Sequence, residues 1–362
     1  MSSRVKRIYS HVKEGVDLIV FANSTDPHVD MSFMYATGLL DGLFEGCAAF
    51  CYPDGSAEIA TSALEEEAAK RSALPLHRFF TRKERDGVYR TLLKGHRRIG
   101  LNFAEITHKA AEEIHKFAPK AKFVDVSQAV MRARLVKEPE EIALLRKAAR
   151  VASQALGDTL PNIRAGRTES EVAADLVYAM QRRGATGPSF RTIVGSGPNS
   201  AEPHYTAGPR KIRKGDLIVI DFGARCDLYC SDVTRTVIVG RPTARQRRMH
   251  DVVRRAQAEA LKRMRPGTKA KAVDTAARSL IDATEFKGRF IHGLGHSIGL
   301  AVHDGGGLNQ ASDLVLRKDM VFTNEPGVYV PGFGGVRIED DVLITASGPQ
   351  LLSAAPRGLI EL

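Results

Sequence analysis

The sequence has few cysteines, and their spacing excludes a disulfide framework. The 362-residue chain holds only four, whereas small secreted domains that rely on disulfides are dense in cysteine. The two members of each pair lie four positions apart in an expected strand, where their side chains share a face but are too distant to bond. We therefore expect reduced thiols at Cys47, Cys51, Cys226 and Cys230.

Long apolar runs are also missing. The chain contains no stretch of about 18 apolar residues, the length that marks a membrane-spanning helix. The first residues, MSSRVKRIYSHVKEGVD, lack the apolar core of a secretory signal peptide. These absences predict a cytoplasmic protein without a membrane partner.

Charge of one sign is in excess but is not concentrated. The chain is 43% hydrophobic and 26% charged, an ordinary globular balance, with a formal net charge of +11. Lysine and arginine are spread along it, as in RKERDGVYRTLLKGHRR and RQRRMHDVVRRAQ. No finger, recognition helix or strand with interleaved aromatic and basic residues accompanies them. We therefore expect a solvated basic surface and no nucleic-acid partner.

The pattern of helices and strands predicts two domains. Residues 1–135 alternate strand and helix signals, including DLIVFA, a hairpin around Pro53-Asp54-Gly55, RRIGLNF and AKFVDV, which is typical of a compact α/β domain. Residues 136–362 begin with a helix that has Pro139 in its first turn. We therefore place a smaller N-terminal α/β domain before an α+β catalytic domain.

The second domain has clear helix and strand signals. Thr168 and Glu171 form a capping box that opens a helix ending at Gly184. Amphipathic helices are expected at Ala244–Met264 and Ala270–Thr284. Strands are expected at DLIVIDFGA, VTRTVIVG, VFTNEPGVYV and VRIEDDVLIT.

Four carboxylates lie in or beside apolar strands. They are Asp221 in VIDFG, Asp232 in CSDVTRT, Glu325 in TNEPG and Glu339 in VRIED. A buried carboxylate needs a cation or hydrogen-bond partners. Each residue taken alone also fits an ordinary turn, a helix cap or the solvent-exposed face of a strand. At least one of the two aspartates that follow Glu339 is expected to face solvent.

The stretch FIHGLGHSIGLAVHD, from Phe290 to Asp304, carries three histidines. Its glycines weigh against one continuous helix, because each is less favourable than alanine there by up to about 1 kcal/mol. We therefore expect strand and turn. Four carboxylates and one imidazole would supply the ligands for two divalent ions. This ligand set suits manganese, cobalt, iron or zinc.

The order of these motifs resembles a known family. DFGA followed by SDVTRT, HGLGHSIGLAVHD, NEPG and GGVRIED is similar to the M24 metallopeptidases, in the branch of Xaa-Pro aminopeptidases (aminopeptidase P) and prolidases. The first domain resembles the creatinase-like domain that precedes the catalytic one in this branch. The implied catalytic fold is the pita-bread fold, in which two pseudo-symmetric halves form a curved sheet covered by helices.

The resemblance implies two divalent metal ions and five protein ligands. Asp221 would bind one ion, and His296 and Glu325 the other, while Asp232 and Glu339 would bridge both. Such a pair of ions, about 3.5–4 Å apart, holds a shared water as hydroxide near neutral pH. The implied reaction is hydrolysis of a peptide bond that precedes proline.

Further site residues follow from the same resemblance. His204, His292 and His303 would line the substrate pocket and take part in catalysis, with His303 helping to stabilise the oxyanion. Glu325 would take the proton from water and pass it to the leaving nitrogen. Arg337, two residues before Glu339, would contact the metal ligands without binding the metal itself. It would also contribute to catalysis and substrate binding.

The substrate length and some rival functions stay open. Prolidases often carry an arginine soon after the position of His303, which can hold a dipeptide's carboxylate, but this chain reads HDGGGLNQ there. The substrate is therefore a dipeptide or a longer peptide. The alternatives are a non-catalytic peptide-binding module, a creatine-type hydrolase and a methionine-type aminopeptidase. The intact set of metal ligands argues against a binding module and a creatine-type hydrolase. The N-terminal domain argues against a methionine-type aminopeptidase. The family also implies a homodimer.

Overall fold

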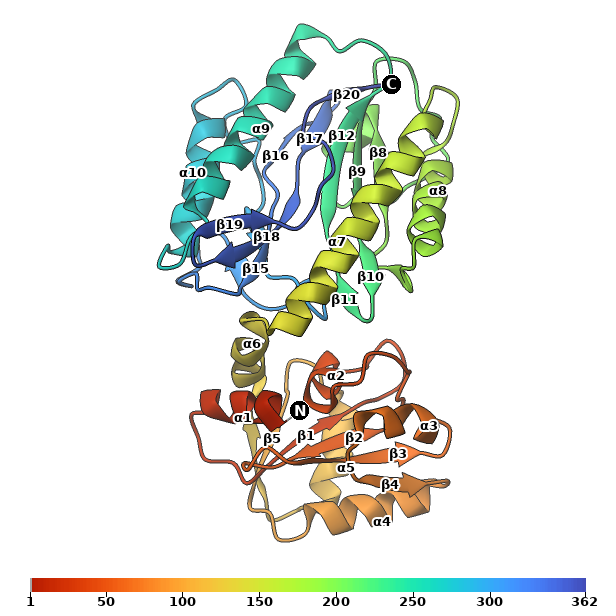
Figure 1. Cartoon of the computed structure of the whole chain (residues 1–362), viewed down its shortest axis with the longest axis vertical. Coiled ribbons are helices and arrows are strands. Elements are labelled where there is room, and N and C mark those ends of the chain that lie inside the picture. The colour runs from red at the N-terminus through yellow and green to blue at the C-terminus, as the bar shows by residue number, and fades with distance from the viewer. Residues whose placement is uncertain (1) are drawn as a thin grey trace. The chain divides into compact units, whose positions relative to one another are not determined.

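The computed structural model describes residues 2–362, which fall into two compact units. The first unit extends to residue 134, and the second comprises residues 135–362. Figure 1 shows the first unit in red to yellow and the second in yellow to blue. No helix within residues 2–362 is both long enough and apolar enough to cross a membrane.

The first unit is an α/β domain built on one mixed sheet of six strands in the order β4-β3-β2-β1-β5-β6. The central strand β1 is buried along its whole length, pairing antiparallel with β2 and parallel with β5. The strands are β1 (Leu18–Ala22), β2 (Ala48–Cys51), β3 (Ala57–Ser62), β4 (Leu76–Phe79), β5 (Arg98–Leu101) and β6 (Lys122–Asp125). The helices are α1 (Ser2–His11), α2 (Met31–Thr37), α3 (Glu66–Ala69), α4 (Arg82–Leu93), α5 (His108–Phe117) and α6 (Ser127–Leu135).

The second unit is an α+β domain with two long helix pairs over its strands (Figure 1). One pair is α7 (Pro139–Thr159) and α8 (Glu169–Arg182), and the other is α9 (Ala244–Arg263) and α10 (Ala270–Asp282). A four-stranded sheet contains β8 (Ile193–Ser196), β9 (Leu217–Phe222), β12 (Val233–Ile238) and β20 (Ile360–Glu361). The remaining strands are β7 (Gly187–Pro188), β10 (Ala224–Cys226), β11 (Tyr229–Cys230), β13 (Gly295–His296), β14 (Gly307–Leu308), β15 (Val321–Asn324), β16 (Gly327–Val330), β17 (Gly334–Arg337), β18 (Asp340–Thr345) and β19 (Gly348–Leu351).

Local sequence signals explain where the first two helices of this unit begin. Helix α7 has Pro139 in its first turn and a reciprocal capping box between Glu138 and Glu141. Helix α8 opens with the predicted capping box of Thr168 and Glu171. These side chains satisfy backbone amides that have no partner within the helix.

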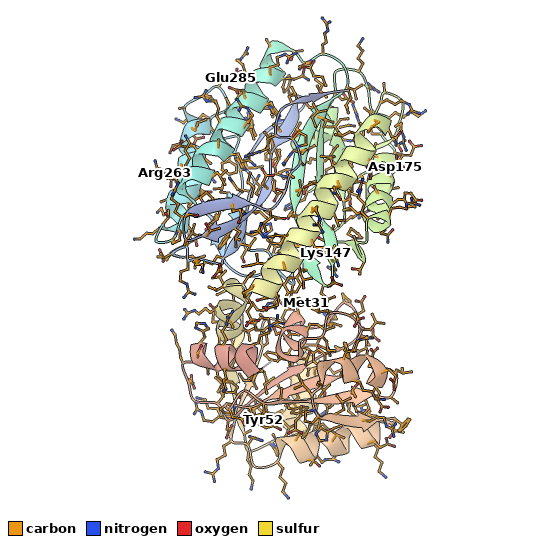
Figure 2. The ribbon with its side chains drawn as sticks, in the orientation of Figure 1. Met31, Tyr52, Lys147, Asp175, Arg263 and Glu285 are labelled. Carbon is orange, nitrogen blue, oxygen red and sulfur yellow. The ribbon has the colours of Figure 1, made fainter. Side chains whose placement is uncertain are left out.

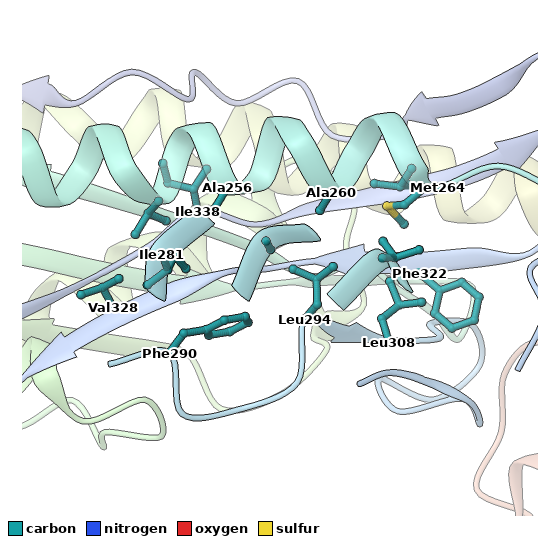
Figure 3. Close-up of a cluster of buried hydrophobic side chains, with 14 of the residues drawn as sticks. Ala256, Ala260, Met264, Ile281, Phe290, Leu294, Leu308, Phe322, Val328 and Ile338 are labelled. Atoms are coloured by element: carbon teal, nitrogen blue, oxygen red, sulfur yellow. The ribbon is translucent and has the colours of Figure 1, made fainter. Parts of the chain in front are cut away.

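The hydrophobic core under α9 and α10 depends on small residues in α9. Figure 3 shows Ala256, Ala260 and Met264 of α9 directed at apolar side chains of the strands and loops below. These include Phe322 and Ile338, and all five side chains are buried. Alanine at two of the facing positions lets the helix approach the sheet closely and keeps the layers packed.

Two strands predicted as continuous are each broken in two. The segment 321–330 forms β15 and β16, which are separated by Glu325 and Pro326. Proline has no N–H to donate, which disfavours a continuous ladder here. The segment 336–345 forms the end of β17 and then β18, with Ile338 and Glu339 between them. Both glutamates therefore lie at strand ends.

Cys226 and Cys230 do not lie on one strand face as predicted. They belong to β10 and β11, and the residues between them, Asp227 and Leu228, have positive φ angles of 47° and 67°. This backbone matches the tight turn of a two-residue hairpin. All four cysteines of the chain are buried free thiols.

The prediction that Asp340 or Asp341 faces solvent is wrong, because each is only 1% exposed. Asp340 accepts hydrogen bonds from Arg235 at 2.6 Å and from Gln257 at 2.8 Å. Asp341 accepts one from the backbone N–H of Asp232 at 3.0 Å. These partners lie far away in the sequence, so the local pattern could not indicate them.

Candidate metal centre

A cavity of about 730 Å³ in the second unit is lined by all nine predicted site residues. The structure therefore gathers side chains that are widely spaced along the chain. Phe190, Ile193 and Val302 add an apolar part to the wall, and three consecutive glycines border it. The predicted site residues in the lining are His204, Asp221, Asp232, His292, His296, His303, Glu325, Arg337 and Glu339.

The antiparallel pair β9 and β12 brings Asp221 and Asp232 to the same end of the sheet. Asp221 lies in β9 opposite Thr234 of β12, and Asp232 immediately precedes β12. The backbone amide of Asp232 is fixed by its hydrogen bond to Asp341. Asp221 is 8% exposed and Asp232 is 5% exposed.

Glu339 is held against β12 by three contacts. Its backbone N–H donates to the carbonyl of Thr234 at 3.0 Å, and the Thr234 hydroxyl donates to Glu339 Oε2 at 2.5 Å. The guanidinium of Arg235 donates to the Glu339 carbonyl. The Thr234 hydroxyl orients the carboxylate, and the two backbone contacts hold the residue in place, as a metal ligand requires.

His296 faces two of the carboxylates. Its Nε2 lies 3.5 Å from Asp232 Oδ2 and 3.5 Å from Glu325 Oε1. Ligand atoms of Asp232, His296 and Glu339 all lie within 4.8 Å of one another. Thr323 positions two members of the group. Its hydroxyl accepts from the backbone N–H of His296 at 3.0 Å and donates to Glu325 Oε1 at 3.1 Å.

The electrostatics of these residues favour bound cations. Burial and the neighbouring acids raise the pKa of Asp232 and Glu339 well above the usual range. Burial raises the pKa of Glu325 to about 8, with a further contribution from Asp221. Burial lowers the pKa of His296 to about 4, so its imidazole is neutral and can donate a lone pair to a metal.

Two buried carboxylate oxygens give a more direct indication than the pKa shifts that the site fits a metal ion. Asp221 Oδ1 and Asp232 Oδ1 are buried, and neither has a hydrogen-bond partner within residues 2–362. A buried acceptor without a partner is rare and unfavourable. Carboxylate oxygens together with one imidazole form a donor set that suits divalent cations such as manganese, cobalt or zinc. The residues present therefore fit a metal centre.

Arg337 is buried and forms several hydrogen bonds beside the acidic cluster. Its guanidinium donates to Asp221 Oδ2 at 2.7 Å, to the Tyr329 hydroxyl at 2.7 Å and to the Thr234 hydroxyl at 3.0 Å. Its side chain is 3% exposed. Neighbouring Tyr329 and acids raise the pKa of Arg337 further above its ordinary value, against the effect of burial. Its charge thus balances part of the acidic cluster.

Tyr329 is a site residue that the sequence analysis missed. Its hydroxyl lies 2.9 Å from His292 Nε2, and His292 Nδ1 lies 2.8 Å from the Gly293 carbonyl. Burial raises the pKa of Tyr329 to about 12 and lowers that of His292 to about 4. Tyr329 therefore donates to a neutral His292 that carries its proton on Nδ1. A tyrosine in the apolar stretch GVYV gave no local signal for this role.

His303 and His204 complete the histidine set on the cavity wall. The rings of His296 and His303 lie 4.1 Å apart between centroids, with an interplanar angle of 62°. Partial burial lowers the pKa of His303, and the nearby His204 adds to this effect. His303 is therefore neutral near pH 7 and can donate a hydrogen bond.

Comparison with known proteins decides the family. The profile of metallopeptidase family M24 matches residues 143–346, which is more than half of the chain, and that of the creatinase/prolidase N-terminal domain matches residues 8–136. The chain belongs to metallopeptidase family M24. The predicted family, the pita-bread fold with its creatinase-like N-terminal domain, and the metallopeptidase class of enzyme are thereby confirmed. Peptidases of this family depend on metal ions.

Similar proteins cover nearly the whole chain. An Xaa-Pro dipeptidase of Pyrococcus horikoshii is 35% identical over 362 residues, which is 99% of each chain. The solved structure of an Xaa-Pro dipeptidase from Bacillus anthracis is 33% identical, with a TM-score of 0.91 and 99% of each chain covered. That of an X-Pro aminopeptidase from Thermotoga maritima is 32% identical, with a TM-score of 0.90, covering 100% of this chain and 99% of that one.

Proposed function

We propose that this M24 peptidase hydrolyses the peptide bond that precedes a proline, using two divalent cations. The observation that carries the proposal is the convergence of buried carboxylates, two of them with unpartnered oxygens, around one neutral imidazole. The proline preference is supported by the names of the similar dipeptidases and aminopeptidase. The proposed metal ligands are Asp221, Asp232, His296, Glu325 and Glu339.

The cations would supply an activated water and polarise the scissile carbonyl. Glu325 is the proposed proton carrier. Its Oε1 faces Thr323 and His296, which leaves Oε2 on the side of His292 at 3.9 Å. This oxygen can take a proton from the attacking water and deliver it to the leaving nitrogen. Arg337 keeps Asp221 oriented through its 2.7 Å contact.

The histidines on the cavity wall are the proposed substrate contacts. His303 is neutral and would donate to the developing oxyanion, while His204 and His292 would bind the peptide beside it. A bond that precedes proline has no N–H at the leaving nitrogen, so the wall near the ring needs no acceptor. Apolar side chains such as Phe190 and Val302 suit a proline ring.

A substrate panel tests the proposed specificity. Xaa-Pro dipeptides, Xaa-Pro-Xaa tripeptides and matched peptides with alanine in place of proline are incubated with the manganese-loaded enzyme. We expect cleavage of the proline peptides and at least about a 100-fold lower kcat/KM for the alanine peptides. Comparable cleavage of both series would contradict the proposed specificity. The ratio between dipeptides and tripeptides separates a dipeptidase from an aminopeptidase.

Two substitutions test the site itself. Glu325→Gln and Asp232→Asn should each lower kcat by more than about 100-fold, since each removes a proposed ligand and Glu325 also carries the proton. A matched control is Asp175→Asn on α8, a surface carboxylate paired with Arg167 (Figure 2). The control should keep normal activity. Near-normal turnover by metal-loaded Asp232→Asn would exclude that residue as a ligand.

A further inference from the structure

A fully buried ammonium lies next to the histidine segment without belonging to the proposed ligand set. The side chain of Lys137 is 0% exposed, and its Nζ lies 3.2 Å from Asp304 Oδ2 and 3.2 Å from Ser297 Oγ. Ser297 follows His296 directly, and Asp304 follows His303 directly. The Lys137 ammonium therefore links Ser297 and Asp304, the residues that follow the proposed site residues His296 and His303.

The segment that carries these histidines closes on itself at the same place. The N–H of Asp304 donates to the Ser297 carbonyl at 2.8 Å, and the N–H of Ser297 donates to the Gly306 carbonyl at 3.2 Å. This narrow neck sets the two imidazole rings, His296 and His303, 4.1 Å apart. The Lys137 ammonium is bonded to both sides of the neck.

The carboxylate of Asp304 packs closely against the backbone at Gly299. A methyl group on Gly299 would lie 2.0 Å from Asp304 Oδ2 and 3.2 Å from Lys137 Cε. The backbone of Lys137 is also fixed, because its N–H donates to the Asp319 carbonyl at 2.8 Å. The ion pair thus links the neck to a backbone segment that is itself hydrogen-bonded to Asp319.

We propose that Lys137 is a positioning residue, which holds the neck between Ser297 and Asp304 so that His296 keeps its direction toward the metal ligands and His303 its place on the cavity wall. The inference rests on the proposed function of this site. Removing the ammonium takes one partner from the buried Asp304 carboxylate and one from the Ser297 hydroxyl, so the neck should shift or open. A shift in His296 weakens metal binding, as loss of groups that orient a metal ligand typically does by about 10–100-fold.

The test uses Lys137→Met, with Lys147→Met as the matched control. Lys147 lies on α7 (Figure 2) and pairs with Asp227 at 2.6 Å, but both side chains are about 40% exposed. Cobalt is titrated into each full-length protein, and its visible absorption, its affinity and the kcat and KM for an Xaa-Pro peptide are measured. We expect Lys137→Met to bind cobalt at least about 10-fold more weakly with an altered spectrum. Its kcat should fall more than its KM changes, while Lys147→Met should match the wild type.

A second variant covers the case in which Lys137→Met does not fold. Asp304→Asn keeps the shape of the side chain and an oxygen that can accept from Lys137, and should show a smaller loss of cobalt affinity in the same direction. A purely structural ion pair would lower the melting temperature yet leave the cobalt spectrum and affinity of the folded variants unchanged. Unchanged cobalt binding by a folded Lys137→Met overturns the proposal, and if that variant does not fold, unchanged cobalt binding by Asp304→Asn overturns it.

The cobalt titration separates this inference from the proposed reaction. If the wild type binds cobalt but cleaves no Xaa-Pro peptide, the proposed substrate is wrong while the role of Lys137 is still decided by the spectra. If the wild type binds no cobalt, the proposed metal centre and the positioning role both fail.

Discussion

At the scale of single residues, the site is a place where acids are buried together. Asp232, Glu325 and Glu339 each have a pKa raised by burial, and neighbouring acids raise it further. Arg337 offsets part of this cluster through Asp221. A group of acids that resists ionisation is unfavourable for the fold at neutral pH unless cations bind, so metal binding and stability should be linked.

The first prediction is that the cation-free protein loses stability as the pH rises from 6.5 to 8.5. Burial raises the pKa of Glu325 from 4.5 to about 8, so folding favours its protonated form. That contribution is complete below about pH 4.5 and is lost as the pH rises through 8. His292 and His296, whose pKa values are lowered to about 4, have the opposite effect, but only below about pH 6.5.

Urea unfolding in the presence of a chelator measures this effect. The free energy of unfolding should fall by about 2 kcal/mol across the window, the size expected for one carboxyl whose pKa is raised to about 8. Glu325→Gln should flatten the dependence, because it removes a titrating group. A stability that stays level or increases over this range would contradict the assignment of buried, mutually repelling acids.

Sequence reasoning at this scale depended on motifs. The motifs pointed to nine side chains that line one cavity. Tyr329, Asp341 and Lys137 were missed, because each acts through a contact with a residue far away in the sequence or in a different motif. A spacing pattern reports which residues share a strand or helix face, but not which distant backbone or side chain they reach.

At the scale of elements, helices were predicted more accurately than strands. The helix expected at 244–264 spans Ala244–Arg263, and the one expected at 270–284 spans Ala270–Asp282. Helical periodicity and caps are local properties, so the sequence carries them. The strands around Glu325 and Glu339 were predicted too long. Pro326 was a local signal for the first break, whereas the break at Glu339 depends on the pairing of β17 and β18 with different strands.

The second prediction concerns the connection between β9 and β10. A Cβ atom on Gly223 would lie 1.8 Å from the Ser231 carbonyl oxygen, and this contact is to backbone that cannot swing aside. Gly223→Ala should therefore lower the free energy of unfolding by at least about 2 kcal/mol. It should also weaken metal binding, because Asp221 and Asp232 flank the two segments.

The matched control is Gly157→Ala on the exposed side of α7. In the described part of the chain, residues 2–362, no atom lies within 4 Å of its added methyl group, apart from the helix's own backbone and the two chain neighbours. Alanine in an exposed helix interior should stabilise the protein by about 0.5–1 kcal/mol relative to glycine. Urea denaturation of both variants checks the pair. A Gly223→Ala protein as stable as the wild type would show that this close approach is not required.

At the scale of the whole molecule, the site depends on how distant segments converge. Strands β9, β12, β15 and β17 come from both halves of the second unit (Figure 1), and the ligands lie in or at the ends of these strands and in β13. Spacing alone could not predict this arrangement. The family resemblance supplied it as an expectation, and the lining of the cavity supports it. The homodimer and the cytoplasmic location stay predictions, and analytical ultracentrifugation would check the first.

The proposed site requires five side chains that together hold two cations. Anomalous diffraction from crystals grown with manganese tests it most directly. We predict two manganese peaks per chain in the cavity, in contact with Asp221, Asp232, His296, Glu325 and Glu339. A single peak, peaks outside the cavity or no peak at all would contradict the account.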